Sequence, residues 1–346
     1  MSAEPYSFPM QKARTVRRHC KIVATGSAFP DAVVTNADII REYGHRVTDA
    51  VIQKTFGIRE RRIVPRGVAD TDLLGAAAER CLAKAAVAPE RLSKLLVTKF
   101  IGDRVLPMTA SMLQRRLRCS TAVQSFDVDG GITSCLHAMD VAASAINSGD
   151  DFVLIVSGGV NSPFMSKTDP RTAFLYGDGA AAILLGPAEE RHIEASYFYS
   201  NWEYADVAVG FSMRDAFRSA VESGNYGTLK DLYRVGNWSD AHDFMVNATE
   251  VTASRMLAAA GMTIRDMDLF FMTEHGRRFS NAVVERLGID VRKVVTVNHK
   301  YGNTMSAMLP IALDEAYGTG MMNTGYRVMI VSVGEGISGG GVIYTV

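Results

Sequence analysis

The residues best placed to perform chemistry surround a sharp turn in the first half of the chain. Residues 126–131 are predicted to be a strand end and a glycine turn, and the apolar run over 133–142 is predicted to be a helix. A strand-to-helix elbow aims its first helical residue, and the amides around it, at a buried reaction centre. That residue is Ile132, which cannot act as a nucleophile. The elbow therefore predicts a reaction centre without its usual attacking group.

Three residues that follow Ile132 carry atoms that could replace it: Thr133, Ser134 and Cys135. Cys135 lies about one helical turn deeper, roughly 5 Å along the axis, so we expect a buried helix cysteine. A hydroxyl attacks only when a base lies within hydrogen-bond reach. We expect none of the three to be the nucleophile, and a covalent mechanism through one of them is the alternative.

Composition restricts the classes of function. The 346 residues include 37 basic and 37 acidic side chains, so nothing indicates an electrostatic binder of nucleic acid. No apolar run approaches the roughly 20 residues of a membrane span, and the basic segment 1–18 lacks a signal core. The four cysteines show no metal-ligand spacing. We expect a cytoplasmic protein that binds no metal and no resident cofactor.

The positioning elements occur twice. Residues 132–159 and 303–336 each run from a turn through an Ala/Met-rich helix to an apolar strand that ends in glycines. A helix before a continuous apolar strand is typical of parallel sheets covered on both faces. We expect two similar α/β halves, at 1–186 and 187–346, around a central helix layer.

A series of short motifs resembles the thiolase superfamily and, within it, the β-ketoacyl-acyl carrier protein synthase III group. The motifs stand in the family's order: Gly57-Ile58-Arg59-Glu60-Arg61-Arg62, Pro107-Met108-Thr109-Ala110-Ser111, Tyr176-Gly177-Asp178-Gly179-Ala180, Glu274-His275-Gly276, Tyr301-Gly302-Asn303-Thr304 and Gly334-Glu335-Gly336. The resemblance implies a five-layered αβαβα thiolase fold. It also places the family's nucleophilic cysteine at Ile132.

The same resemblance implies roles for two further residues. His275 and Asn303 match the histidine and asparagine that stabilise negative charge on a thioester oxygen, where such donors contribute several kcal/mol. The backbone at Gly334 and Gly336 is a further candidate donor, and Glu335 a candidate base. Taken alone, His275 would be a surface histidine and Asn303 a helix N-cap.

Basic residues near two of these motifs suggest how an acyl donor docks. Residues 51–55 lack the aromatic and arginine with which the family holds coenzyme A, which favours the phosphopantetheine arm of a carrier protein over acyl-CoA. We expect an acidic carrier to meet a basic surface formed by Lys54, Arg59, Arg61, Arg62, Arg277 and Arg278. A solvated edge is the alternative.

The predicted function is therefore an atypical ketosynthase III-like acyltransferase in specialised metabolite or lipid biosynthesis. It would transfer an acyl group directly, or link condensation to decarboxylation, without a cysteine intermediate. Met108 and Met112 fall where the family dimerises, which predicts a homodimer. The alternative is a catalytically silent subunit that pairs with an active ketosynthase homologue.

Overall fold

The computed structural model describes residues 16–100, 102, 104, 106–202, 213–225, 238–334 and 338–346. Its first five-stranded sheet has the order β1-β7-β6-β4-β5 and its second the order β10-β9-β11-β12-β8. The first consists of β1 (His19–Ala28), β4 (Leu92–Thr98), β5 (Gln124–Val128), β6 (Phe152–Gly159) and β7 (Gly179–Ala188). The second consists of β8 (Ile193–Ser200), β9 (Leu269–Met272), β10 (Val294–Val295), β11 (Arg327–Gly334) and β12 (Ser338–Thr345).

The two sheets have the same topology. In the first sheet, β7 pairs antiparallel with β1 and with β6, and the remaining neighbours are parallel. In the second sheet, β12 pairs antiparallel with β8 and with β11, and the remaining neighbours are again parallel. This confirms the predicted repetition. The predicted joint at 186/187 falls within β7, which continues to Ala188. The division into two domains stays a prediction.

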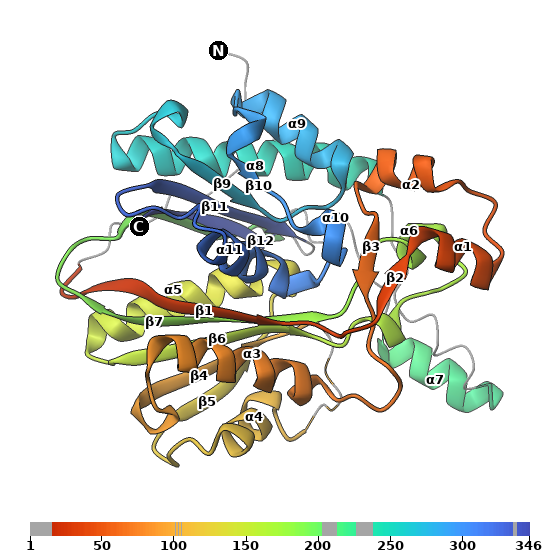
Figure 1. The fold of residues 1–346 in the computed structure, drawn as a ribbon, viewed down its shortest axis with the longest axis horizontal. Coiled ribbons are helices and arrows are strands. Elements are labelled where there is room, and N and C mark those ends of the chain that lie inside the picture. Colours follow the sequence, from red (N-terminus) through yellow and green to blue (C-terminus); the bar gives the residue numbers. More distant parts are fainter. Residues whose placement is uncertain are drawn as a thin grey trace.

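Six helices form layers around the two sheets (Figure 1). Between the sheets lie α5 (Ser134–Ser148) and α11 (Met308–Gly318). The first sheet is covered by α3 (Asp70–Ala85) and α4 (Thr109–Leu117), the second by α8 (Trp238–Ala260) and α9 (Arg277–Leu287). The predicted αβαβα architecture is thereby confirmed.

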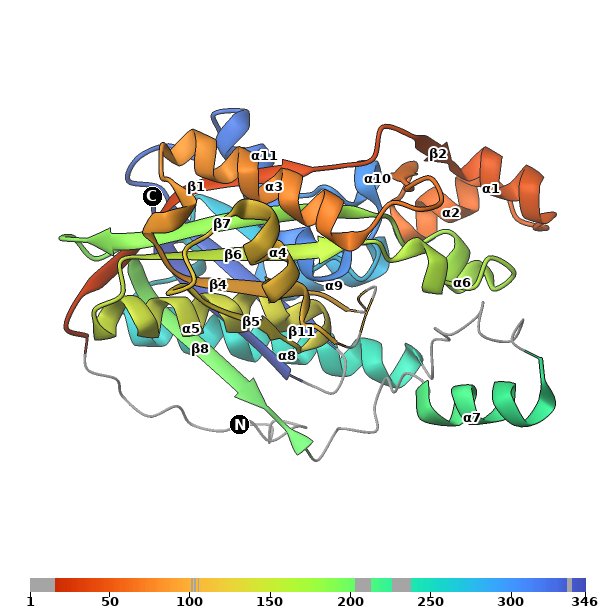
Figure 2. The same cartoon turned by 90° about the horizontal axis from the view of Figure 1, so that it is seen from below.

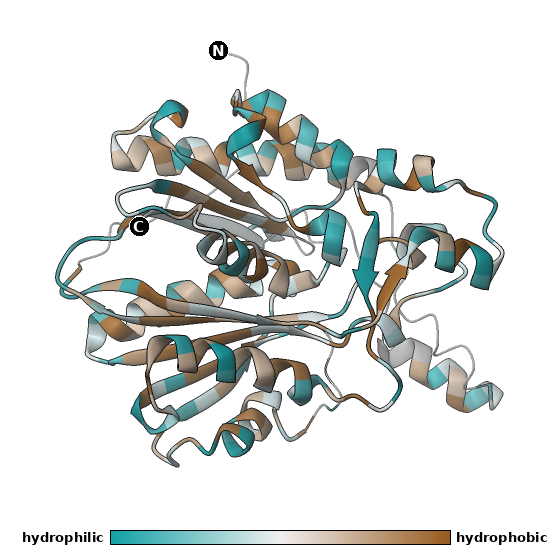
Figure 3. Cartoon of the chain, viewed as in Figure 1, coloured by the Kyte–Doolittle hydropathy of each residue, from teal (hydrophilic) through white to brown (hydrophobic). Residues whose placement is uncertain are grey.

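Burial follows from these layers. The run Val153–Val156 is fully buried because helices cover both faces of its sheet. Helix α11 is apolar on nearly all sides because it lies between two sheets, whereas the outer helices are polar on the side away from the sheets (Figure 3). Among the described helices, none combines the length and apolar character needed to cross a bilayer.

Smaller elements gather at one end of the layers (Figure 2). They are β2 (Val33–Thr35), α1 (Asn36–Tyr43), α2 (Asp49–Phe56), β3 (Glu60–Arg62), α6 (Pro170–Ala173), α7 (Met213–Ser223) and α10 (Asn298–Tyr301). Short 3₁₀ segments are η1 (Pro89–Arg91), η2 (Gly131–Thr133), η3 (Ser162–Phe164), η6 (Ile264–Asp266), η7 (Val291–Lys293) and η8 (Met305–Ala307). Of these, η2 and η8 precede the two central helices and lie against each other.

Candidate active site

The elbow before α5 is present, and Ile132 fills its centre. Gly131 adopts a φ of 57°, in the left-handed region that favours glycine, and η2 leads directly into α5. Ile132 is only 2% exposed. Its Cγ2 atom would lie 2.4 Å from a Cβ placed on Gly334, so its side chain packs directly on the end of β11. The place where a nucleophile is expected is therefore filled by an apolar side chain.

The three alternative nucleophiles are fixed within the start of the helix. The Thr133 hydroxyl donates to the Gly130 carbonyl at 2.7 Å and also lies 2.8 Å from the Ser338 hydroxyl. The Ser134 hydroxyl donates to the Gly131 carbonyl at 2.7 Å. Cys135 is fully buried, and burial raises the pKa of its thiol to about 11. None of these contacts provides a base, and a thiol with that pKa is almost entirely protonated at neutral pH.

His275 lies after the end of β9, and its ring is oriented by two neighbours. Its Nε2 atom is 2.7 Å from the carbonyl oxygen of Val333, and the ring meets Phe279 edge-on with centroids 5.0 Å apart. A carbonyl only accepts hydrogen bonds, so Nε2 carries the proton and donates it to Val333. In a neutral ring Nδ1 then holds the lone pair. His275 can donate Nε2–H to a substrate oxygen only by exchanging its Val333 partner.

Asn303 is held with its side-chain amide in a defined orientation. The residue is 3% exposed, and its Oδ1 atom accepts a hydrogen bond from the Met305 amide at 2.8 Å. Its own amide donates to the Leu175 carbonyl at 2.8 Å, and its carbonyl accepts from Gly177. Because Oδ1 is occupied, Nδ2 is the group left to donate, and no described residue accepts from it. Asn303 is not the N-cap of a helix: it precedes Thr304, the N-cap residue of η8, and its side chain binds the first amide of that segment.

The elements that carry these residues converge on the elbow. Val333, the partner of His275, is followed by Gly334, which contacts Ile132. Segment η8, whose first amide is bound by Asn303, lies against η2. The backbone at Gly334 therefore lies beside Ile132, and its role as a donor stays a prediction. The predicted base Glu335 and the predicted donor Gly336 lie outside the described residues.

A buried carboxylate that the sequence did not single out for chemistry precedes His275. Glu274 is 7% exposed and accepts hydrogen bonds at Oε1 from the amides of Val297 and Asn298, at 3.0 and 3.2 Å. Burial raises the pKa of Glu274 to about 7, although the two amides act to lower it. The signals in the sequence were its place in the motif Glu274-His275-Gly276 and a charged residue two positions after an apolar strand.

The six basic residues proposed for docking separate into two groups. Lys54, Arg59, Arg277 and Arg278 are exposed. Arg277 lies beside the end of α2, because a Cβ placed on Gly57 would be 3.5 Å from the Cβ of Arg277. The surface at the end of α2 thus continues to the start of α9.

The other two do not belong to that surface. Arg61 is fully buried, and its guanidinium donates to Asn36 Oδ1 and to the carbonyls of Val34 and Phe174. Its predicted role in docking is therefore wrong, because its guanidinium is hydrogen-bonded inside the protein and does not reach the surface. Arg62 is half-buried and donates to the Asp31 carbonyl at 3.3 Å.

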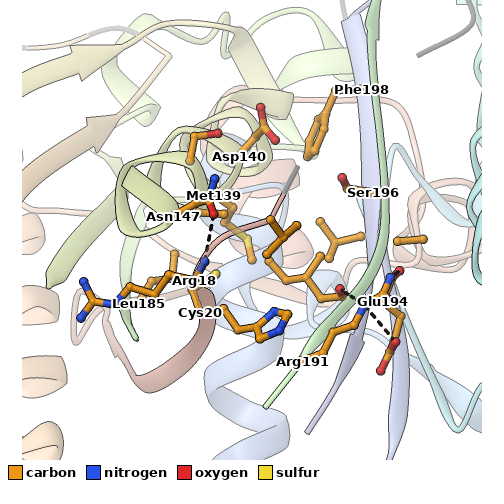
Figure 4. A pocket seen from close by; sticks show the side chains of 17 residues that line it. Arg18, Cys20, Met139, Asp140, Asn147, Leu185, Arg191, Glu194, Ser196 and Phe198 are labelled. Carbon is orange, nitrogen blue, oxygen red and sulfur yellow. Dashed lines mark hydrogen bonds and ion pairs between the residues drawn. The ribbon is translucent and has the colours of Figure 1, made fainter. Parts of the chain in front are cut away.

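A separate cavity of about 240 Å³ lies along α5, beyond the elbow (Figure 4). Its walls come from one side of α5, from β8 and from the chain that enters β1, and include Met139, Asn147, Phe198 and Arg18. Asn147 Oδ1 accepts from the Arg18 amide at 3.0 Å and so closes one end. None of the candidate active-site residues lines this cavity.

Comparison with known proteins agrees with this arrangement. Residues 126–201 match the family model for 3-oxoacyl-[acyl-carrier-protein] synthase III, and residues 257–346 match the model for the C-terminal part of that enzyme. A β-ketoacyl-[acyl-carrier-protein] synthase III from Desulfitobacterium hafniense is 33% identical over 327 residues, which cover 93% of this chain and 96% of that protein. The same enzyme from Koribacter versatilis is 30% identical over 331 residues, covering 93% and 96%.

Solved structures show the same fold. The 3-oxoacyl-[acyl-carrier-protein] synthase III of Aquifex aeolicus superposes with a TM-score of 0.84 at 27% identity, covering 94% of this chain and all of the other. A priming β-ketosynthase of the R1128 polyketide pathway superposes with a TM-score of 0.86 at 24% identity, covering 98% and 99%. The chain therefore belongs to the β-ketoacyl-[acyl-carrier-protein] synthase III family of the thiolase superfamily, with isoleucine at position 132.

Proposed function

We propose that this protein is an acyltransferase that acts on acyl thioesters without forming an acyl-enzyme intermediate. The observation that carries the proposal is the combination at the elbow. Ile132 packs on Gly334 at the elbow, while His275 and Asn303 are each oriented by a hydrogen bond to the backbone, at Val333 and Met305. An oriented amide donor is useful to a reaction that builds charge on a thioester oxygen, whether or not a thiol is present.

Direct transfer requires few groups. The nucleophile of a bound acceptor adds to the thioester carbonyl, and the carbonyl oxygen becomes an oxyanion that accepts a hydrogen bond from Asn303 Nδ2. The carbon–sulfur bond then breaks, the thiolate leaves, and the proton lost by the acceptor is returned to sulfur. His275 Nδ1 is the atom suited to carry that proton, because Nε2–H is bound to Val333. Holding both substrates together supplies a further part of the barrier.

A malonyl thioester would use the same donors in another way. Loss of carbon dioxide leaves an enolate, whose oxygen carries the charge that Asn303 stabilises. The enolate carbon then attacks a second thioester or takes up a proton. Attack on a second thioester expels that thioester's thiol, whereas uptake of a proton gives an acetyl thioester and releases carbon dioxide without free thiol. Neither outcome requires a nucleophile at position 132.

The donor is proposed to be carried by an acyl carrier protein. The relatives are named β-ketoacyl-[acyl-carrier-protein] synthase III, which supports this class of donor. Lys54, Arg59, Arg277 and Arg278 are the exposed residues that would meet an acidic carrier. An acyl-CoA donor would react by the same thioester chemistry, with coenzyme A in place of the carrier protein.

A homodimer in the cytoplasm is proposed as the working form. Strand β5 is an edge of the first sheet, β8 is an edge of the second, and α5 lies between these edges on one face (Figure 2). Met108 is 40% exposed at the start of α4, which packs beside β5. An open strand edge with apolar neighbours is a surface that proteins usually cover.

The second candidate is a catalytically silent subunit of an active ketosynthase homologue. It is favoured by the packing of Ile132 on Gly334 and by the burial of Cys135, which together leave no thiol at the centre. Such a subunit would co-purify with a second synthase-like chain. Turnover by the isolated homodimer would exclude it.

The deciding experiment is intact mass spectrometry after incubation with acyl and malonyl thioesters, on CoA and on carrier protein, with assays of free thiol and carbon dioxide. Thioester consumption without an adduct, lost in His275→Ala, is the expected result. His192→Ala is a matched control, because His192 is also half-buried and lies 2.8 Å from a backbone carbonyl, that of Thr345. A stable adduct on Thr133, Ser134 or Cys135 would overturn the mechanism, and no consumption would favour the silent subunit.

A further inference from the structure

The carboxylate of Glu274 joins the two segments that present His275 and Asn303. Glu274 directly precedes His275, and its Oε1 atom accepts the amides of Val297 and Asn298 at 3.0 and 3.2 Å. These amides open α10, which ends at Tyr301 and is followed by Gly302 and Asn303. One side chain therefore connects the segment after β9, which carries His275, with the helix that leads into Asn303.

Other contacts also hold α10. Strand β10, just before it, pairs in parallel with β9, and the Arg59 amide donates to the His299 carbonyl at 3.0 Å. The Asn298 side chain donates to the Phe56 carbonyl at 3.4 Å, which is a long hydrogen bond, and its Oδ1 is buried without a partner. Glu274 adds to these contacts a side-chain acceptor for the first two amides at the start of α10.

The cost of burying the Glu274 carboxylate indicates that this residue does more than fill space in the core. A buried carboxylate is unfavourable unless hydrogen bonds compensate for its lost hydration. Within the part of the chain that the structure describes, no cationic side chain forms an ion pair with Glu274, and the two amides are its hydrogen-bond donors. An apolar residue would pack there without that penalty. Unlike an apolar side chain, the carboxylate accepts hydrogen bonds from the first amides of α10 and so fixes their position.

We propose that Glu274 is a positioning residue, which sets the separation of His275 and Asn303 by binding the first amides of α10. The contact is independent of any activity, and only its meaning for catalysis rests on the proposed function. When Glu274 cannot accept, α10 and Asn303 shift relative to His275. A displacement near 1 Å in such a pair reduces turnover by about 10²-fold.

Two substitutions of similar volume separate acceptance from packing. Glu274→Gln keeps an oxygen that accepts the two amides, whereas Glu274→Met fills the space and accepts nothing. In Glu274→Met we expect faster hydrogen exchange at Val297 and Asn298 and about 10²-fold lower kcat, with KM changed by less than about three-fold. Glu274→Gln should restore slow exchange and most of kcat.

Asp314→Asn is the matched control. Asp314 is also a buried carboxylate, but it binds Thr25, Ser27 and Lys84, away from α10. It should leave exchange at residues 297–303 unchanged. Wild-type exchange in Glu274→Met, or faster exchange with unchanged kcat, would overturn the proposal. Should Glu274→Met not fold, fast exchange at Val297 and Asn298 in Glu274→Gln with full turnover would also overturn it. If the wild type consumes no thioester, the proposed function fails, and the exchange rates still decide the role of Glu274.

Discussion

Ile132 and Gly334 are in direct contact across the two halves of the molecule, because a Cβ on Gly334 would lie 2.4 Å from Ile132 Cγ2. The absence of a side chain at position 334 therefore makes room for the isoleucine. Overpacking of a buried site typically destabilises a protein by about 1–3 kcal/mol. We predict that Gly334→Ala lowers the free energy of unfolding by that amount in urea titrations. In an Ile132→Ala background the same change should be much less harmful, and equal effects in both backgrounds would contradict the contact.

Ile132→Cys should convert the elbow into a covalent site. The new thiol would stand at the first residues of a helix, where amides favour the thiolate, in the region that contains His275. We predict an acyl adduct on the introduced thiol after incubation with acyl thioester, detected by peptide mass spectrometry. The parent protein, with Cys135 buried, should show none. Failure of Ile132→Cys to acylate would mean that the thioester does not reach the elbow.

Asn303→Asp separates the two functions of the asparagine amide. The aspartate can still accept from the Met305 amide, so the turn before η8 should remain. It cannot donate to an oxyanion, and its charge opposes one. We predict a decrease in kcat of about 10²–10³-fold per folded protein, together with a lower thermal transition, because the new carboxylate is buried. Unchanged turnover would exclude Asn303 as a donor.

Glu274 predicts how stability depends on pH. Burial raises the pKa of its carboxyl from 4.5 to about 7 in the folded protein. A raised carboxyl pKa means that the folded state prefers the protonated form. The stabilisation from this preference is therefore fully present in the free energy of unfolding below about pH 4.5, and it is lost as the pH rises through about 7.

The loss is at most about 3.5 kcal/mol, since the pKa rises from 4.5 to about 7 and each pKa unit corresponds to about 1.4 kcal/mol. We predict that Glu274→Gln gains stability relative to the parent between pH 5 and pH 8, as measured by urea unfolding at both values. A difference that does not change with pH would show that the buried carboxyl has an ordinary pKa.

Charge reversal tests carrier docking. Arg277→Glu and Arg278→Glu should raise KM for an acyl carrier protein donor more than KM for the acyl-CoA donor, because the carrier presents an extended acidic surface, whereas the charge of coenzyme A is confined to its phosphates. The effect should diminish at high salt. Arg115→Glu on α4 is a control, since Arg115 is also exposed but lies on the opposite outer layer. Equal losses with both donors would place the arginines at the thioester instead.

The sequence predicts the architecture well because the information is local. The apolar strands and the repeated order of turn, helix and strand determine which segments are buried, and the two sheets follow that order. The elbow at Ile132 is predicted for the same reason. Its geometry depends on the adjacent glycines and on the helix that follows them.

Features that depend on distant partners were not predictable. Arg61 lies in a run of charged residues that is typical of a solvated edge. In the folded protein its guanidinium instead donates hydrogen bonds to Asn36 Oδ1 and to the Phe174 carbonyl, which belong to other parts of the chain. The proton position on His275 depends on Val333, 58 residues away. The role of Glu274 depends on Val297, 23 residues away. Side-chain pairing across such separations has no signature in spacing or composition.

The identical strand order of the two halves has an evolutionary consequence for Ile132. Segment η2 with α5, and segment η8 with α11, occupy equivalent places in the two halves. Under the proposed function, one copy provides the attacking position and the other follows Asn303. A duplicated ancestor could thus lose the thiol from one copy while inheriting the charge-stabilising half intact. Such a fold can exchange one chemistry for another by changing a single residue on one side of its internal symmetry.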